Sequence, residues 1–252
     1  MRLIMWMSAA GEIMVVNSTR HPAGCWAEEV AVPYRLFKER GYQVEVVTAG
    51  GRQPVLDRRS LNPDVLHAMR PPGSRADDRA RAASWREVLR GAGELRDPTP
   101  VESLDRRALI DCDGLFICGG LACLADRTEA TLLGRLLPEA AALEIPVAAI
   151  GYGLAATLAA RDAEGNYLFS GRRLTVLGRE EERRLPLHPR LPIDLEDELT
   201  AHGAEVARGP IPWDAWVVED RGLVTGQNPY SANLLAERFL ARLAASRARQ
   251  VM

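Results

Sequence analysis

The sequence predicts an α/β fold, a doubly wound and mostly parallel sheet that is sandwiched by helices. Short apolar runs recur along the chain, and segments with the helical spacing of apolar residues separate them. Two of these runs, Leu115–Ile117 and Val147–Ile150, end at glycine turns, as central parallel strands often do. Sites in such sheets form beyond the carboxyl ends of the strands, so we expect the turns at Gly119, Gly120 and Gly151 to gather around one site.

Each element follows from its local pattern. Leu3–Met7 predicts the first strand, and Gly11–Arg20 predicts a polar loop. Ala27–Arg40 has helical spacing and is followed by a glycine, so it predicts a helix. Tyr42–Val47 predicts the second strand. Residues 62–100 are rich in Pro, Arg, Asp and Gly, which indicates a surface insertion within a single domain that spans residues 1–252.

The second half of the chain continues the alternation of strands and helices. Its predicted elements are, in order, a strand within Ala108–Cys118, a helix over Ala130–Leu143, the strand Val147–Ile150, a helix that starts at Ala155–Ala160, a β-rich stretch over Tyr167–Leu177, a helix over Leu195–His202, a hairpin of Trp216–Val218 with Leu223–Val224, and a last helix over Ser231–Ala245.

Composition limits the classes of function. The net charge of −2 gives no field that favours nucleic acid or an anionic membrane. The apolar run Leu3–Met7 is too short for a signal peptide or a membrane span, so we expect a cytoplasmic protein. The four cysteines show neither C-x-x-C pairing nor zinc spacing, so we expect free thiols and no metal. The glycine pairs lack dinucleotide-binding spacing, and we expect no cofactor. Lys38 is the only lysine, which is typical of a GC-rich bacterial genome.

The stretch AAIGYGLAA, residues 148–156, lies where a strand passes into a helix. Many α/β enzymes place a nucleophile at such an elbow, because the sharp turn lifts one side chain out of the backbone. Here the candidate positions hold Gly151 and Tyr152.

Several segments together resemble one protein family over nearly the whole chain. They are HPAGCWAEEVAVPYRLFKERGYQVEVVTAGGRQPVLDRRSL, DGLFICGG, IPVAAIGYGLAATLAA, FSGRRLT, REEE and GLVTGQNPYSANLLAERFL. On these segments the chain resembles the Hsp31-like, type 1 glutamine amidotransferase-like branch of the DJ-1/PfpI superfamily. The resemblance implies a flavodoxin-like domain, a homodimer, and thiol chemistry in glyoxalase III-like enzymes, in chaperones or in both.

The resemblance also implies roles for single positions, and several residues depart from the family pattern. Gly151 stands where the family has its cysteine nucleophile, and Tyr152 stands where it has the following histidine. Leu121 and Trp216 replace further histidines of the pattern. Glu29, the acid that lies against the thiol in the family, is retained.

The third member of the family's triad is a carboxylate from a separate loop. Glu182 falls at that position, with Glu180 and Glu181 as near alternatives. Backbone amides after the Gly-Gly turn, near Gly120, would stabilise an oxyanion.

Glycine has no side chain, so we expect no covalent thiol catalysis from position 151. Glu29, buried without a thiol partner, would act as general acid or base and Tyr152 would assist it. Leu121 and Trp216 would make the cavity apolar and suited to a small carbonyl-containing or polycyclic molecule. The expected reactions are hydration, elimination or isomerisation, in a role that fits bacterial secondary metabolism.

Three alternatives stay open. The first two are a non-catalytic ligand-binding protein and a holdase-type chaperone, in either of which Glu29 would be only a structural acid. The third, glyoxalase III-like activity, is the least expected of them. His21, Cys25, Cys118 and Cys123 lie near the predicted site in sequence, and reactivity of these cysteines would require a lowered thiol pKa.

Overall fold

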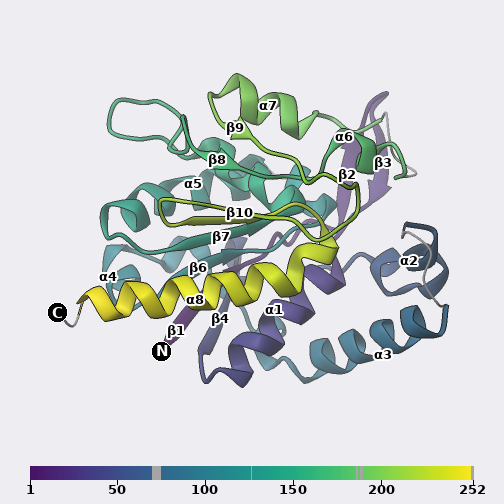
Figure 1. The fold of residues 1–252 in the computed structure, drawn as a ribbon, viewed down its shortest axis with the longest axis horizontal. Coiled ribbons are helices and arrows are strands. Elements are labelled where there is room, and N and C mark those ends of the chain that lie inside the picture. The colour runs from purple at the N-terminus through teal and green to yellow at the C-terminus, as the bar shows by residue number, and fades with distance from the viewer. Residues whose placement is uncertain (70–74, 126, 186, 188–189, 251–252) are drawn as a thin grey trace.

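The computed structural model describes residues 1–69, 75–125, 127–185, 187 and 190–250 (Figure 1). Its strands are β1 (Arg2–Trp6), β2 (Glu12–Val15), β3 (Thr19–Pro22), β4 (Gln43–Thr48), β5 (Thr99–Pro100), β6 (Gly114–Ile117), β7 (Val147–Ile150), β8 (Arg173–Leu174), β9 (Glu205–Val206), β10 (Val217–Asp220) and β11 (Leu223–Gly226).

The α-helices are α1 (Ala27–Glu39), α2 (Pro63–Met69), α3 (Arg75–Gly91), α4 (Arg106–Ile110), α5 (Arg127–Ala142), α6 (Arg179–Glu182), α7 (Leu195–Ala201) and α8 (Ala232–Gln250). Short 3₁₀ segments connect them, of which η2 (Arg58–Leu61), η5 (Leu121–Leu124) and η6 (Gly151–Ala159) bear on the site.

One seven-stranded sheet organises the molecule, in the order β10-β11-β7-β6-β1-β4-β5. Its neighbouring strands pair in parallel except β10, which runs antiparallel to β11. The predicted α/β fold with a mostly parallel sheet is therefore confirmed. From β1 the chain adds β4 and β5 on one side of the sheet, and then returns to add β6 and β7 on the other side. The order of strands therefore reverses between β1 and β6, and open α/β sheets bind their ligands at such a switch point.

Alternation of side chains along each strand fills a hydrophobic core on both faces of the sheet. On β1, Leu3 and Met5 pack with residues of α1, α3 and α8. Ile4 and Trp6 point to the other face and pack with residues of α4, α5 and η6. Figure 1 shows α1, α3 and α8 together on one side of the sheet. Burial on both faces explains why the strands are continuous apolar runs.

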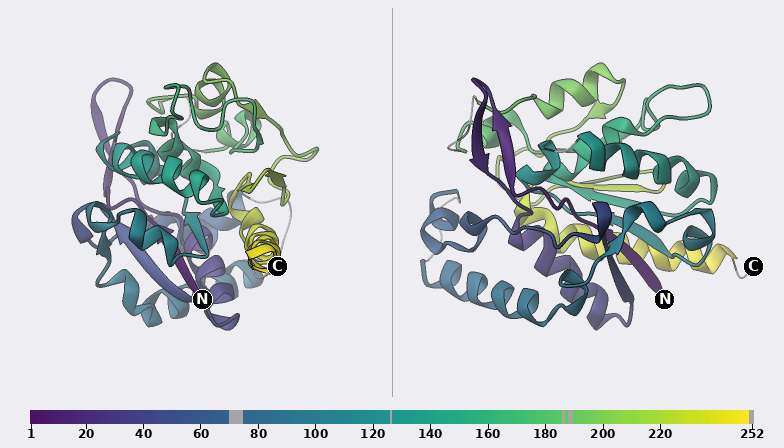
Figure 2. Two further views of the ribbon diagram at one scale, coloured as in Figure 1. Left: turned by 90° about the vertical axis from the view of Figure 1, so that its left-hand side faces the viewer. Right: turned by 180° about the vertical axis from the view of Figure 1, so that it is seen from behind.

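Residues 11–20, predicted as a polar loop, instead contribute most of the hairpin of β2 and β3, which projects from the body in Figure 2. Asn17 and Ser18 adopt positive φ angles of 75° and 58° at its turn. Asn tolerates that conformation, but Asn-Ser is a weaker hairpin signal than Asn-Gly. Only alternate residues of β2 are buried, so its hydrophobic pattern is short.

Three further boundaries differ from the prediction. Ala108–Ile110 belongs to α4 rather than to a strand, because the Asp105 side chain caps that helix by accepting from Ala108 N. The stretch 167–177, predicted to be β-rich, contains only the two-residue strand β8. The segment after β7, predicted as the start of a helix at Ala155, is the 3₁₀ segment η6, which begins at Gly151.

Residues 62–100, interpreted as a surface insertion, contain α2, α3 and the edge strand β5. Trp85 and Leu89 of α3 are buried against the helix layer that includes Tyr34 of α1. No helix among the described residues combines the length and the apolar character needed to span a membrane.

Candidate functional site

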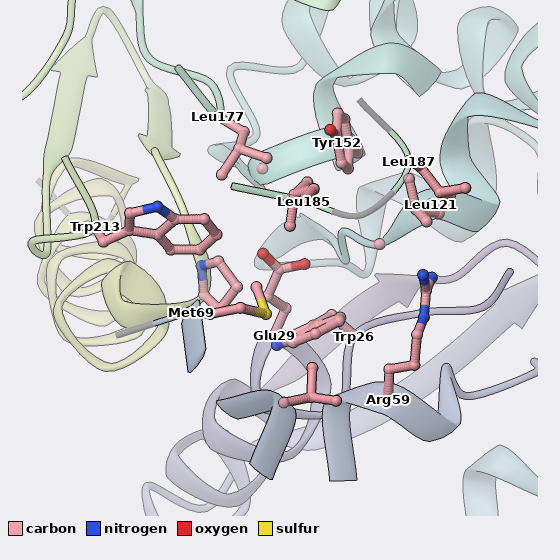
Figure 3. A pocket seen from close by; sticks show the side chains of 14 residues that line it. Trp26, Glu29, Arg59, Met69, Leu121, Tyr152, Leu177, Leu185, Leu187 and Trp213 are labelled. Carbon is pink, nitrogen blue, oxygen red and sulfur yellow. The ribbon is translucent and has the colours of Figure 1, made fainter. Parts of the chain in front are cut away.

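A pocket opens at the carboxyl ends of the central strands, where the glycine turns after β6 and β7 were expected to meet. It contains about 690 Å³ that no protein atom fills, part of it open to solvent. Figure 3 shows side chains converging on this space from two sides. The lining residues are Trp26, Glu29, Arg59, Val65, Met69, Gly120, Leu121, Gly151, Tyr152, Leu177, Leu185, Leu187, Trp213 and Pro229.

Glu29 lies at the base of this pocket, in the first turn of α1. The helix begins directly after the Gly24–Trp26 segment, which hydrogen-bonds the loop after β6 through Trp26 N and Gly119 O. Only 3% of Glu29 is exposed, and its carboxylate fits between two glycine turns. A Cβ atom on Gly119 would overlap with Oε2 of Glu29, so this turn requires glycine.

Gly151 has the same relationship to the other carboxylate oxygen. Its φ is +51°, a conformation that residues with side chains rarely adopt, and a Cβ there would lie 2.9 Å from Oε1 of Glu29. The elbow after β7 is thus built directly against the Glu29 carboxylate. A side chain at this position would need both a strained backbone and a displaced Glu29.

No described residue donates a hydrogen bond to the Glu29 carboxylate. Burial raises the pKa of Glu29 well above its ordinary value, and the nearby charge of Glu28 raises it further. A carboxyl group whose pKa is raised in this way, and that faces a pocket, has the properties of a general acid or base.

Tyr152 lines the opposite wall and donates a 2.9 Å hydrogen bond from its hydroxyl to Oε1 of Glu182. Both residues are buried. Burial raises the pKa of Glu182 to about 7, and the Tyr152 hydrogen bond acts in the opposite direction. Burial and Glu182 raise the pKa of Tyr152 well above its ordinary value, so it remains a neutral phenol. Glu182 therefore positions the Tyr152 ring, and does not itself line the pocket.

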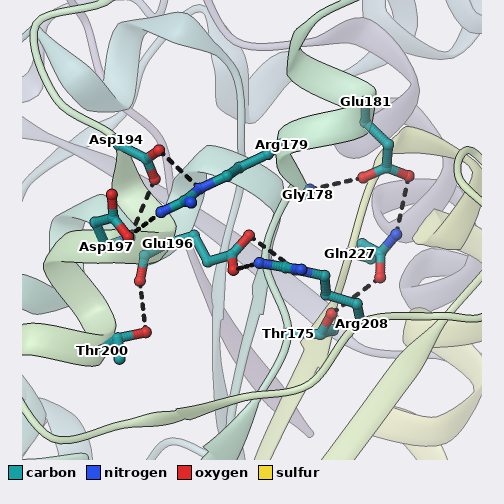
Figure 4. Close-up of polar contacts among 10 residues, drawn as sticks. All are labelled: Thr175, Gly178, Arg179, Glu181, Asp194, Glu196, Asp197, Thr200, Arg208 and Gln227. Carbon is teal, nitrogen blue, oxygen red and sulfur yellow. Dashed lines mark hydrogen bonds and ion pairs between the residues drawn. The ribbon is translucent and has the colours of Figure 1, made fainter.

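The neighbouring glutamates have different surroundings. Glu181 is a structural acid, because its Oε1 accepts from Trp213 N, Gln227 Nε2 and Asn228 Nδ2 at 2.7–2.9 Å. Its Oε2 accepts from Gly178 N at 2.8 Å, as Figure 4 shows. Glu180 is exposed. Of the three candidates, only Glu182 is hydrogen-bonded to a side chain of the pocket.

Arg59 is a pocket residue that the sequence analysis missed. It lies on η2, and its Nε and Nη2 donate to the Asp57 carboxylate at 3.0 and 2.6 Å. Among the described lining residues, Arg59 and Glu29 are the charged ones. The sequence LDRRSL does contain a signal for a helix start, because an acid two residues before an arginine can cap it. Nothing in the local sequence, however, places this turn beside Glu29.

Gly120 and Leu121 line the pocket as expected, but Trp216 is not among the lining residues. Trp216 N donates to Ser231 Oγ, and its ring lies against Gly209, whose Cβ would be 3.0 Å from it. Trp213 takes the place expected for Trp216 and is 2% exposed. The Asp214–Asn228 and Glu181–Trp213 hydrogen bonds fix this loop, and such tertiary contacts are not visible in local sequence.

The other residues in question do not line the pocket. His21 is on the β2–β3 hairpin. Cys25 and Cys123 donate from Sγ to Ser8 O and Cys118 O. Burial raises the pKa of Cys118 well above its ordinary value, as do the charges of Cys25 and Glu29. Among the described residues, all four cysteines are buried, and no acidic, histidine or cysteine side chains group in a way that could hold a metal ion.

The chain was compared with known families, proteins and structures. No family model matches it. The glutathione-independent glyoxalase hsp3101 of Schizosaccharomyces pombe is 25% identical over 246 residues, 92% of this chain and 95% of the yeast protein. A solved crystal structure with 28% identity covers 97% of this chain and 98% of its own, with a TM-score of 0.77. Glyoxalase III from Candida albicans shares the fold, with 22% identity, 96% of each chain and a TM-score of 0.76.

The chain is similar, over most of its length, to proteins of the Hsp31/glyoxalase III-like branch of the DJ-1/PfpI superfamily. Its fold is of the flavodoxin type. The sequence analysis ranked glyoxalase III-like activity as the least expected alternative. Relatives that are named glyoxalases do not support that ranking.

Proposed function

We propose that this protein is an enzyme of the glyoxalase III type, which isomerises the hydrate of a small 2-oxoaldehyde to a 2-hydroxy acid. In this proposal Glu29 transfers the proton, and no thiol forms a covalent bond with the substrate. The observation that carries the proposal is the Glu29 carboxylate, which lies in the pocket against Gly151 without a described hydrogen-bond donor.

The proposed step balances without an oxidant or a reductant. Water first adds to the aldehyde carbon C1 of the substrate. The Glu29 carboxylate then takes the C1 proton, and the electron pair of that C–H bond forms the C1=C2 double bond of an enediolate as the C2 carbonyl oxygen gains the charge. Glu29 returns the proton to C2, and one hydroxyl proton of C1 passes to the C2 oxygen, which yields the 2-hydroxy acid. The raised pKa of Glu29 makes its carboxylate a stronger base than an exposed glutamate.

Other residues would bind and orient the substrate. The Tyr152 hydroxyl lies at the pocket wall and is fixed by Glu182, so it can act as a polar contact for a substrate oxygen. Leucine and tryptophan side chains of the lining limit the access of water, which strengthens electrostatic interactions within the pocket. A pocket that Glu29 and Tyr152 both line supports an enzyme. A cavity filled by Tyr152 and Trp216 would instead have favoured a non-catalytic protein.

The test is turnover of methylglyoxal and phenylglyoxal, with lactate and mandelate measured by NMR. We expect product from the wild-type protein and at least about a hundredfold loss of kcat/KM in Glu29→Gln. Glu39→Gln is the control, since Glu39 lies in the same helix but at its exposed end, and does not line the pocket. Equal turnover by wild type and Glu29→Gln would overturn the proposal.

A further inference from the structure

Arg59 presents a free edge of its guanidinium at the wall of the pocket. A guanidinium has five N–H donors, and the Asp57 carboxylate accepts one from Nε and one from Nη2. Within the described part of the chain, no group accepts from Nη1. The hydrogens that remain on Nη1 and Nη2 share one edge, which is the geometry that binds a carboxylate through two parallel hydrogen bonds.

Asp57 holds this edge in place. It is 5% exposed, and its Oδ1 also accepts from Arg59 N at 2.9 Å as the N-cap of η2. The arginine is therefore anchored at both its backbone and its side chain. Because the side chain is already ordered, a ligand that binds to it loses little affinity to conformational entropy. Figure 3 shows the guanidinium pointing into the pocket near Leu121.

Among the described lining residues Arg59 is the one cation, which suits a ligand with a single negative charge when the buried Glu29 carboxyl is protonated. Asp57 offsets part of the Arg59 charge, and the described lining contains no second cation that would hold a phosphate dianion. The remaining lining is mostly aliphatic and aromatic, with Trp26, Leu121 and Leu187 among it. Apolar walls lower the local dielectric constant and so strengthen a contact between Arg59 and an anion.

We infer that the pocket recognises organic carboxylates with an apolar body, the carboxylate bound by the free edge of Arg59 and the apolar body against the leucine and tryptophan side chains. This inference rests on the proposed function, because the proposed reaction produces a 2-hydroxy carboxylic acid. It narrows that function to compounds with an aryl or alkyl substituent, and assigns Arg59 to the carboxylate that the reaction forms.

A binding experiment tests the inference without the need for turnover. The probes are 1-naphthylacetate and its neutral isostere 1-naphthylacetamide, titrated by calorimetry at pH 7.5 into the full-length protein. We expect the wild type to bind the carboxylate at least about tenfold more tightly than the amide. Arg59→Met removes this preference and leaves amide affinity within about twofold, since only the charged contact is lost.

Two further variants make the result decisive. Arg58→Met removes an exposed arginine from the same segment and should keep the full preference. Arg59→Lys keeps the charge beside Asp57 but not the planar fork, so it should keep the fold and only part of the preference. Three results would overturn the inference. They are equal affinity of the wild type for the two probes, no binding of either probe, and equal losses of affinity for both probes in Arg59→Met. Glu29→Gln should keep the preference, so loss of turnover alone bears only on the proposed reaction.

Discussion

Oε1 of Glu29 lies 2.9 Å from the point at which a Cβ on Gly151 would be placed. The base of the pocket therefore accommodates either the acid in its present position or a side chain on the elbow, unless one of them moves. This relationship makes the substitution of Gly151 a sensitive test of the site.

Gly151→Ala should unfold more easily and lose activity. Gly171 offers a matched control, because its φ of +64° imposes the same backbone strain while nothing lies within 4 Å of a Cβ there. We expect Gly171→Ala to cost about 1 kcal/mol from strain alone. Gly151→Ala should cost more, and only it should reduce kcat/KM, since it displaces Glu29. Urea denaturation and turnover of both variants check this, and equal effects of the two would contradict it.

Glu29→Gln should stabilise the protein at alkaline pH. The folded-state pKa of Glu29 is raised, so its contribution to the free energy of unfolding is largest below its unfolded-state pKa and is lost as pH rises through the folded-state value. At pH 8 the variant should be more stable than wild type by at least about 1 kcal/mol. The difference in the free energy of unfolding between the variant and the wild type should be smaller at pH 5. Urea denaturation at both pH values measures it, and a variant less stable than wild type at pH 8 would contradict the account of Glu29.

Tyr152→Phe should raise the pKa of Glu182 above its value of about 7, because the Tyr152 hydrogen bond lowers that pKa. It should also destabilise the protein by about 1–3 kcal/mol, since a buried carboxyl group loses its partner. ¹³C NMR of labelled glutamate side chains follows the titration, with Glu182→Gln to assign the resonance. An unchanged or lowered pKa would show that the pair does not exist in solution.

Glu28→Gln should move the pH profile of kcat/KM to lower pH. The negative charge of Glu28 raises the pKa of Glu29, so its removal lets Glu29 ionise more readily. A general base is active in its ionised form, and the rising limb of the profile should follow its pKa. Glu39→Gln, at the exposed end of the same helix, should leave the profile in place. A shift to higher pH in Glu28→Gln would contradict the assignment of that limb to Glu29.

The sequence identified the sheet and the acid of the site, but not the whole wall of the pocket. Continuous apolar runs such as Val147–Ile150 are determined by burial on both faces, so local pattern is enough to find them. Glu29 and Gly151 follow from the family resemblance together with the turn. Trp213 reaches the pocket through a loop that Glu181 fixes, and the turn that carries Arg59 is placed by the hydrogen bond from Asp57 N to Cys25 O. Such contacts between distant segments leave no periodic signal.

The most direct test of the account compares kcat/KM for phenylglyoxal in Glu29→Gln and Cys118→Ala. Cys118 is the thiol whose pKa responds to the charge of Glu29, so the pair separates carboxylate from thiol chemistry at one place. We expect at least about a hundredfold loss in Glu29→Gln and a change within about threefold in Cys118→Ala. Full activity in Glu29→Gln together with an inactive, folded Cys118→Ala would contradict the central claim.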